Sequence, residues 1–79
     1  MSLTPTRFLS LRLGAHHKPT EGARGLVLER LDGQWVLYYL DSQDGITGHR
    51  FVDTLDDGMD YAAQEFGVRR DEWMENSDN

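Results

Sequence analysis

Residues 25–41, GLVLERLDGQWVLYYLD, decide the fold of this 79-residue chain. Two apolar runs, Gly25 to Leu31 and Gln34 to Asp41, are separated by the dipeptide Asp32-Gly33. Aspartate and glycine both tolerate positive φ, which a two-residue type I′ turn requires at its two central positions. The stretch therefore predicts an antiparallel β-hairpin.

The flanking residues extend this hairpin into a meander. Residues 6–13 alternate apolar and polar side chains with a period of two, which predicts a strand before the hairpin. Residues 46–53 predict a further strand after it. Between the first strand and the hairpin, residues 14–24 combine glycine and proline with polar side chains, so we expect a mobile loop there.

The apolar period changes to 3.6 beyond residue 53. Apolar residues then recur with the spacing of one helix face, at Leu55, Met59, Ala62, Ala63 and Phe66. Thr54 is a good N-cap, and Gly67 suits the left-handed position that ends a helix. The sequence predicts a helix from Leu55 to Phe66, a short helical turn over residues 70–76 and a frayed tail over residues 77–79.

These elements predict one small α+β domain over residues 1–79: an antiparallel β-meander of three to four strands, then one amphipathic α-helix and a short C-terminal helical turn. The chain has no cysteine, so it forms no disulfide, and small domains without such staples often associate with another chain. The longest apolar run has six residues, whereas a membrane-spanning helix needs about 20. We find no secretory signal and expect a cytoplasmic protein without a membrane partner.

Pairing across the hairpin turn gives the sheet two apolar faces. The first face is predicted to hold Leu26, Leu28, Trp35, Leu37, Tyr39, Ile46 and Val52. The second face is predicted to hold Val27, Leu31, Val36, Tyr38, Leu40 and Phe51, mixed with Glu29, His49 and Asp53. One helix of about three turns covers a single face, and we expect it on the first. The second face then needs a cover: Trp73 with the C-terminal turn, the N-terminal strand, or a second copy of the chain.

Negative charge is concentrated in the second half of the chain. Residues 41–79 carry eleven acidic and three basic residues, and the whole chain has a net charge of −6. This balance repels phosphate backbones, so we expect no nucleic-acid partner, whereas a basic protein fits better. Three helix carboxylates, Asp56, Asp57 and Asp60, have no basic residue four positions later. We expect them to form an acidic helix end that attracts a cationic partner.

The residue pattern offers little catalytic chemistry. The sequence contains no motif typical of a phosphate, dinucleotide, serine-hydrolase or zinc-protease site. We therefore predict no enzyme activity, no catalytic residue and no cofactor. The candidate metal ligands are His16, His17 and His49. Because adjacent histidines on an extended loop point apart, and no carboxylate is placed to fix a tautomer, we predict no metal site.

Two further segments carry a recognisable pattern. The strand Trp35 to Asp41 reads W-x-L-x-Y-L-D, and Glu65 to Trp73 reads E-F-G-V-x-x-x-E-W. Together they resemble a group of small bacterial proteins with no assigned function, over roughly residues 34–74. The resemblance implies an α+β domain of a few antiparallel strands and a helix in a bacterial cytoplasm, and it transfers no functional residue. Gly58 departs from the alanine expected there and predicts a less regular first helical turn.

The uncovered second face and the acidic helix end lead to one functional prediction. We expect a non-enzymatic protein–protein interaction module, homodimeric, whose surface comprises Val36, Tyr38, Leu40, Phe51, Asp56, Asp57 and Asp60. One alternative is an immunity-like or inhibitor protein that binds a basic partner through the acidic helix. A minimal metal-binding protein using the three histidines is another.

Overall fold

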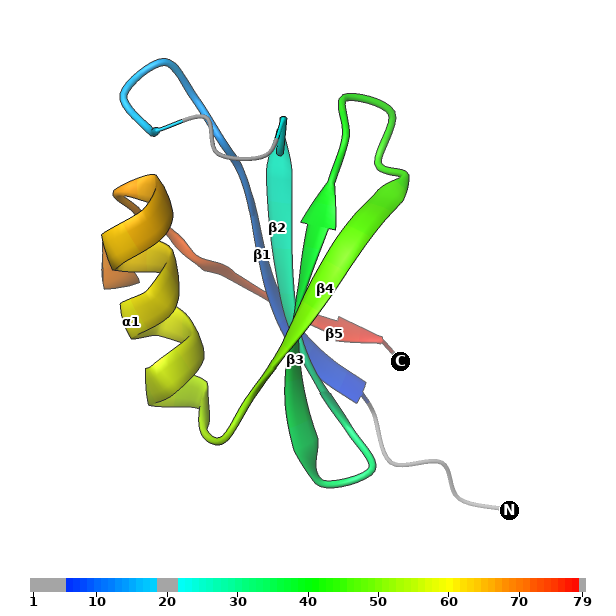
Figure 1. The fold of residues 1–79 in the computed structure, drawn as a ribbon. Helices are drawn as coiled ribbons and strands as arrows, with labels where there is room; N and C mark the ends of the chain where they lie inside the picture. Colours follow the sequence, from blue (N-terminus) through cyan, green and yellow to red (C-terminus); the bar gives the residue numbers. More distant parts are fainter. Residues whose placement is uncertain (1–5, 19–21, 79) are drawn as a thin grey trace.

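The computed structural model describes residues 6–18 and 22–78, which form an antiparallel sheet with one helix across a single face (Figure 1). The elements in chain order are β1 (Thr6–Arg12), β2 (Gly25–Leu31), β3 (Gln34–Leu40), β4 (Ile46–Val52), α1 (Leu55–Phe66), the 3₁₀ turn η1 (Arg70–Glu72) and β5 (Met74–Asp78). The five strands lie in the order β4-β3-β2-β1-β5. This architecture confirms the predicted α+β class, the meander and the helix that follows it.

The central hairpin forms as its sequence predicts. Asp32 and Gly33 both have positive φ, 51° and 80°, as a type I′ turn requires. Leu31 therefore lies opposite Gln34, and Leu28 lies opposite Leu37. This register places the alternate leucines of β2 and β3 on the first face.

One register prediction is wrong. The pairing of β3 with β4 shifts between Tyr39 and Leu40, so Tyr39 lies opposite Gly48 while Leu40 lies opposite Ile46. The extra residue on β4 is a β-bulge, which reverses the side to which the preceding side chain points. Ile46 therefore lies on the second face rather than on the first.

The helix has the predicted bounds because both ends are capped. The Thr54 hydroxyl accepts a hydrogen bond from the Asp57 amide at 3.1 Å. Gly67 takes the left-handed conformation, and the amides of Gly67 and Val68 donate to the carbonyls of Ala63 and Ala62. These caps satisfy backbone groups at the helix ends that would otherwise lack partners.

The core lies between α1 and the first face, as predicted. It includes Leu26, Leu28, Leu37, Tyr39, Val52, Ala62 and Phe66, all of them buried. Gly58 sets the distance between the two layers, because a Cβ at this position would lie 2.7 Å from Cδ1 of Leu28. The glycine that departs from the expected alanine is therefore the point of closest approach between helix and sheet, and α1 is helical through it.

The C-terminal segment differs from the prediction. The helical turn ends at Glu72, and Met74–Asp78 then form β5, which pairs with β1. We expected fraying from residue 77, but the strand continues through Asp78, and Asn79 lies outside the described residues. The reason is tertiary: β1 offers a free edge along which the polar segment pairs.

The loop between β1 and β2 is tied to the domain at several points. The amide of Leu13 donates to the Arg24 carbonyl at 2.9 Å, and that of Lys18 donates to the Phe66 carbonyl at 2.9 Å. The predicted mobility of residues 14–24 stays a prediction, and residues 19–21 of that loop lie outside the described residues. Among the described residues, no helix has the length and apolar character needed to cross a membrane.

Candidate interaction surface

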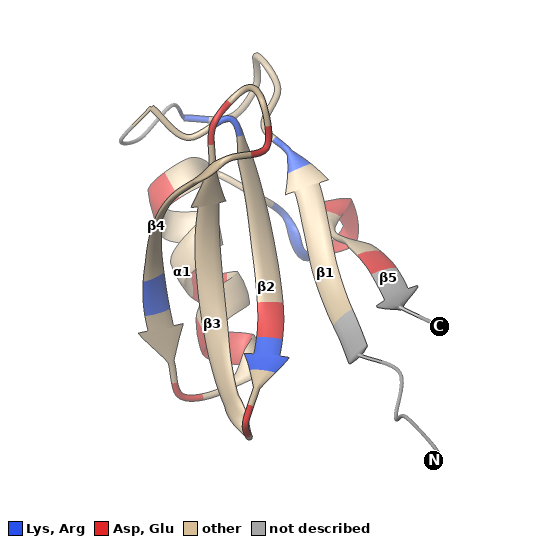
Figure 2. Cartoon of the chain, turned by 90° about the vertical axis from the view of Figure 1, so that its right-hand side faces the viewer, with Lys and Arg blue, Asp and Glu red and all other residues tan. Residues whose placement is uncertain are grey.

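The second face of the sheet is open along its whole width. Figure 2 shows this side, with the strands in front and α1 behind them. Four large apolar side chains are at least half exposed: Leu31 (50%), Ile46 (64%), Phe51 (57%) and Met74 (65%). By the strand registers all four lie on the second face. The exposed large hydrophobic residues are thus gathered on one side instead of being scattered.

Partly buried apolar side chains fill the space between these four. They are Phe8, Val27, Tyr38 and Leu40. Val36, which we predicted as part of the surface, is only 1% exposed because its neighbours on the same face enclose it. Of the predicted apolar surface residues, Phe51 is therefore exposed, Tyr38 and Leu40 are half-buried, and Val36 supports the surface from beneath.

The structure excludes two of the three covers considered for this face. Trp73 is 9% exposed and belongs to the core cluster of the first face, so the expectation that it covers the second face is wrong. The N-terminal strand β1 pairs beside β2 within the sheet and does not fold over it. A second copy of the chain is the one cover of the three that the described residues leave open.

The polar groups of the second face include Glu29 of β2, which lies opposite Phe8 and Val36 and is half-buried. Arg12 Nη2 lies 3.0 Å from Asp44 Oδ2 at one end of the face. His49 contacts the ring of Phe51 edge-on, with 5.3 Å between ring centroids. Strand β3, which lies between β4 and the middle strand β2, carries no charged residue, as its uniform tan colour in Figure 2 shows.

The acidic helix end lies on the other side of the sheet from the second face. Its charge is reduced by Arg70 of η1, whose guanidinium lies 2.9 Å from Asp56 Oδ1 and 3.2 Å from Asp60 Oδ1. The sequence reasoning examined only partners four positions away and missed this one, which lies ten and fourteen positions away. The predicted surface therefore separates into an apolar part and an acidic part that do not adjoin.

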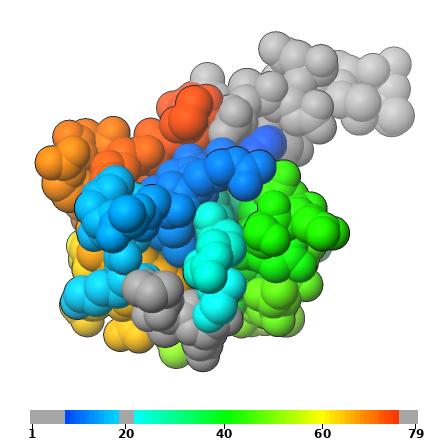
Figure 3. Space-filling model, turned by 90° about the horizontal axis from the view of Figure 1, so that it is seen from above, coloured from blue at the N-terminus to red at the C-terminus, as the bar shows by residue number. Residues whose placement is uncertain are grey.

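A second cluster of interest joins the loop after β1 to η1. His16 Nε2 lies 2.7 Å and His17 Nε2 lies 2.9 Å from the same oxygen, Oε1 of Glu72. Figure 3 shows the light-blue loop packed against the orange segment that contains η1. The two histidine rings are 3.8 Å apart between centroids, so they point the same way, and our expectation that they point apart is wrong. His49 lies on β4 and is not part of the cluster.

The hydrogen bonds of His17 indicate how this cluster works. The Gly14 amide donates to His17 Nδ1 at 2.8 Å, so Nδ1 holds the lone pair and Nε2 holds the proton. A metal bound at Nε2 would need the opposite tautomer, with two N–H groups facing each other at Gly14. The side chain of His17 is only 2% exposed and has no room to turn away. The geometry therefore favours a hydrogen-bonded anchor over a three-ligand metal site.

Glu72 is the acceptor at the centre of this anchor. The Arg69 amide donates to its other oxygen, Oε2, at 2.8 Å. This backbone hydrogen bond, followed by the one from His16, lowers the pKa of Glu72 to about 2. The carboxylate is thus ionised whenever the two histidines donate to it. Sequence reasoning missed Glu72 because 55 residues separate it from His17.

No family model, curated protein or solved structure gives a significant match to this chain. The resemblance to small bacterial proteins therefore stays a prediction, and functional argument rests on the surfaces described above.

Proposed function

We propose that this protein is a small non-enzymatic interaction module that forms a homodimer through the second face of its sheet. One observation carries the proposal: among the residues that the structure describes, all four large hydrophobic side chains that are at least half exposed lie on this face. Soluble monomers seldom leave a contiguous apolar patch of this extent in water. We further propose that it acts in the bacterial cytoplasm, in keeping with a chain that has no cysteine.

Charge supports a second copy as the occupant. The chain has a net charge of −6, so two copies repel each other unless their acidic groups stay apart. The helix carboxylates Asp56, Asp57 and Asp60 lie across the sheet from the second face. A face-to-face pair keeps these acidic helices on the outside, while each second face contributes Glu29 and the paired Arg12 and Asp44.

The size of the face is compatible with such a pair. Four strands of seven residues and one of five, with a spacing of about 4.8 Å and a rise of about 3.3 Å per residue, give a sheet area of about 520 Å² without the side chains. The smaller specific interfaces bury about 600 Å² per partner. Two sheets packed face to face in this way would form a β-sandwich with an α-helix on each outer side.

The proposal is tested by sedimentation equilibrium on the wild-type chain and on Phe51→Asp. We expect the wild type to sediment at twice its 9.1 kDa mass. The aspartate variant should be monomeric, with the dimer weakened more than about 30-fold, because a large exposed aromatic side chain of the second face is replaced by a charge. Gln64→Asp adds the same charge on exposed helix surface and should stay dimeric. A wild-type monomer at high concentration would contradict self-association.

An immunity-like or inhibitor role through the acidic helix receives less support. Arg70 already pairs with two of the three carboxylates that would bind the basic partner. Replacing Asp56, Asp57 and Asp60 with asparagine tests this role, because capture of a basic partner would then be lost.

A further inference from the structure

The outer edge of β4 is a second unoccupied surface, distinct from the sheet face. β4 is the last strand of the sheet on its side, and no described strand pairs with its outer edge. The backbone N–H and C=O groups along such an edge are free to pair with another extended chain. The edge contains no proline, which cannot donate to a strand ladder, and beyond the bulge at Thr47 its regular part runs from Gly48 to Val52.

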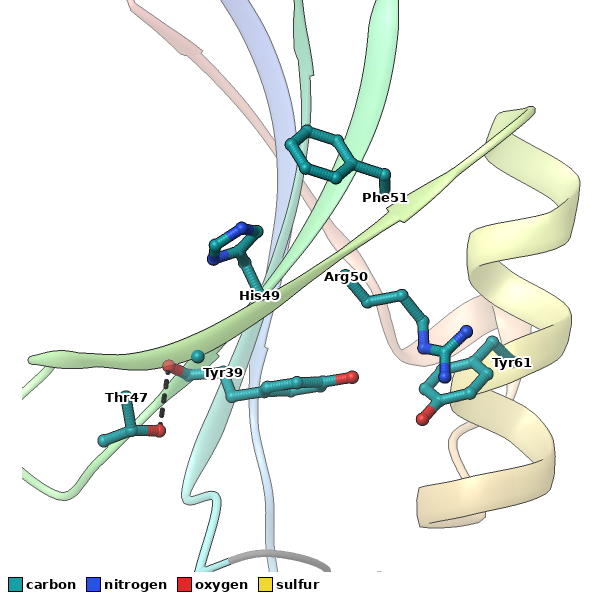
Figure 4. A pocket seen from close by; sticks show the side chains of 7 residues that line it. Tyr39, Thr47, His49, Arg50, Phe51 and Tyr61 are labelled. Carbon is teal, nitrogen blue, oxygen red and sulfur yellow. Dashed lines mark hydrogen bonds between the residues drawn. The ribbon is translucent and has the colours of Figure 1, made fainter.

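An open groove follows this edge and is lined from both sides of the sheet. On the helix side Tyr39, Arg50 and Tyr61 direct their polar ends toward one another, while His49 and Phe51 point to the opposite side of β4 (Figure 4). Gly48, near the middle of the edge, has no side chain to shield its backbone. A Cβ at this position would lie 3.2 Å from Cδ2 of Tyr39. The groove thus combines an accessible backbone with different side-chain chemistry on each side.

Arg50 is the charged group of this groove. Its guanidinium lies over the Tyr61 ring, 4.3 Å from the centroid, which holds it in place without neutralising it. Three other arginines, Arg12, Arg69 and Arg70, pair with carboxylates, but no carboxylate of the described residues pairs with Arg50. β4 itself carries no acidic residue, although the chain as a whole has fourteen.

The phenol groups beside Arg50 add hydrogen-bond donors. Burial, followed by the neighbouring Tyr61 hydroxyl, raises the pKa of Tyr39 to about 12. The Tyr39 hydroxyl therefore keeps its proton at neutral pH. A guanidinium flanked by phenol hydroxyls supplies a positive charge together with N–H and O–H groups that can donate hydrogen bonds to a carboxylate.

We propose that the edge of β4 binds an extended, acidic peptide segment by strand addition, with a glutamate or aspartate side chain of that segment on Arg50. Main-chain hydrogen bonds to β4 would supply sequence-independent affinity, and the carboxylate would select for acidic segments. The sheet gains a sixth strand in this complex. The carboxylate would bind on the helix side of β4, at Arg50, whereas His49 and Phe51 of the groove belong to the second face, so the peptide site and the proposed dimer share these two residues.

The test is an NMR titration of the ¹⁵N-labelled full chain with a capped heptapeptide that alternates threonine and glutamate. We expect shifts and slower hydrogen exchange confined to the amides of β4 and its groove. The same peptide with lysine in place of glutamate should bind at least about tenfold more weakly, because it loses the charge-assisted hydrogen bonds. A peptide with a central proline should also bind weakly, because proline cannot complete the added strand.

Variants of Arg50 test whether the carboxylate of the peptide binds this residue. Arg50→Gln should weaken the glutamate peptide by at least about tenfold, and Arg50→Lys should restore part of the loss. Arg30→Gln removes the same charge from exposed β2 and should bind like the wild type. The proposal is overturned if the lysine peptide binds equally well, if Arg50→Gln has no effect, or if the shifts fall on β1, β2 and β5 instead of β4.

Discussion

Gly58 is the residue on which the distance between helix and sheet depends. Alanine favours a helix by about 1 kcal/mol over glycine, yet its Cβ would lie 2.7 Å from Leu28 Cδ1 and 3.3 Å from Val52 Cγ2. Both neighbours are buried, and forcing a methyl group into a packed core costs about 1–3 kcal/mol. We expect Gly58→Ala to lower the free energy of unfolding by about 1 kcal/mol or more in a urea titration, despite the better helix former. Gln64→Ala, at an exposed position of the same helix, should change it by less than about 0.5 kcal/mol, and a stabilised Gly58→Ala would contradict the close packing.

The ionised carboxylate of Glu72 makes the free energy of unfolding depend on pH in the acidic range. Its pKa is lowered to about 2 in the folded chain, below the ordinary value of 4.5. The folded state therefore gains stability from the ionised carboxylate above pH 4.5, and this gain is lost as the pH falls from 4.5 toward 2. We expect Glu72→Gln to unfold more easily at neutral pH and to lose less stability over that acidic range than the wild type. Parallel acid titrations followed by circular dichroism measure this, with Asp53→Asn at an exposed position as the control; identical acid curves for Glu72→Gln and the wild type would contradict the role of Glu72.

The tautomer of His17 leads to an expectation about zinc. A saturated three-ligand site would raise the free energy of unfolding by about 2.7 kcal/mol at a hundredfold excess over its Kd. Because Nδ1 of His17 accepts from the Gly14 amide, we expect excess zinc to leave the melting temperature unchanged. A rise that disappears in His17→Ala but persists in His49→Ala would show that the ring can exchange its partners for a metal.

At the level of elements, the β2–β3 hairpin depends on its two turn residues. Gly33 has a φ of 80°, which alanine adopts only with strain. We expect Gly33→Ala to lower the free energy of unfolding by about 1 kcal/mol. The neighbouring exposed Gln34→Ala is the control, since it leaves the turn unchanged. Equal midpoints for the two variants in urea would contradict a type I′ turn.

The hairpin and the helix could be predicted from sequence because their signals are local. The Asp32-Gly33 turn, the Thr54 cap and the Gly67 ending each lie within a few residues of the element they bound. β5 could not be predicted in this way, because its residues MENSD show no apolar alternation and the strand forms only where β1 offers an edge. The bulge that moves Ile46 to the second face depends on loop geometry: Asp41 accepts from the amides of Gln43 and Gly45, each at 2.8 Å.

The residues of the second face divide in the same way into those that local sequence signals predict and those that depend on tertiary contacts. Parity across the hairpin correctly placed Tyr38, Leu40 and Phe51 opposite the helix. Met74 joined that face only through β5, and Ile46 only through the bulge. Contacts between distant segments, such as Arg70 with Asp56 or Glu72 with His16, carry no local signal, since each depends on how η1 docks against the rest of the chain.

At the level of the whole molecule, the proposed dimer depends on what covers the second face. The sheet has its core on one side and four exposed large apolar residues of the described chain on the other. Such a sheet needs a second layer over its exposed apolar face. Trp73 and β1 were both considered as covers from the sequence, but neither lies over the second face. We infer that a second copy of the chain covers this face in solution.

This claim is tested most directly by isotope-filtered NOE spectroscopy on an equimolar mixture of labelled and unlabelled chains. We predict intermolecular cross-peaks from the methyl groups of Leu31, Ile46 and Met74, all on the second face. Cross-peaks that arise only from α1, for example from Met59, or a complete absence of intermolecular cross-peaks at millimolar concentration, would contradict it.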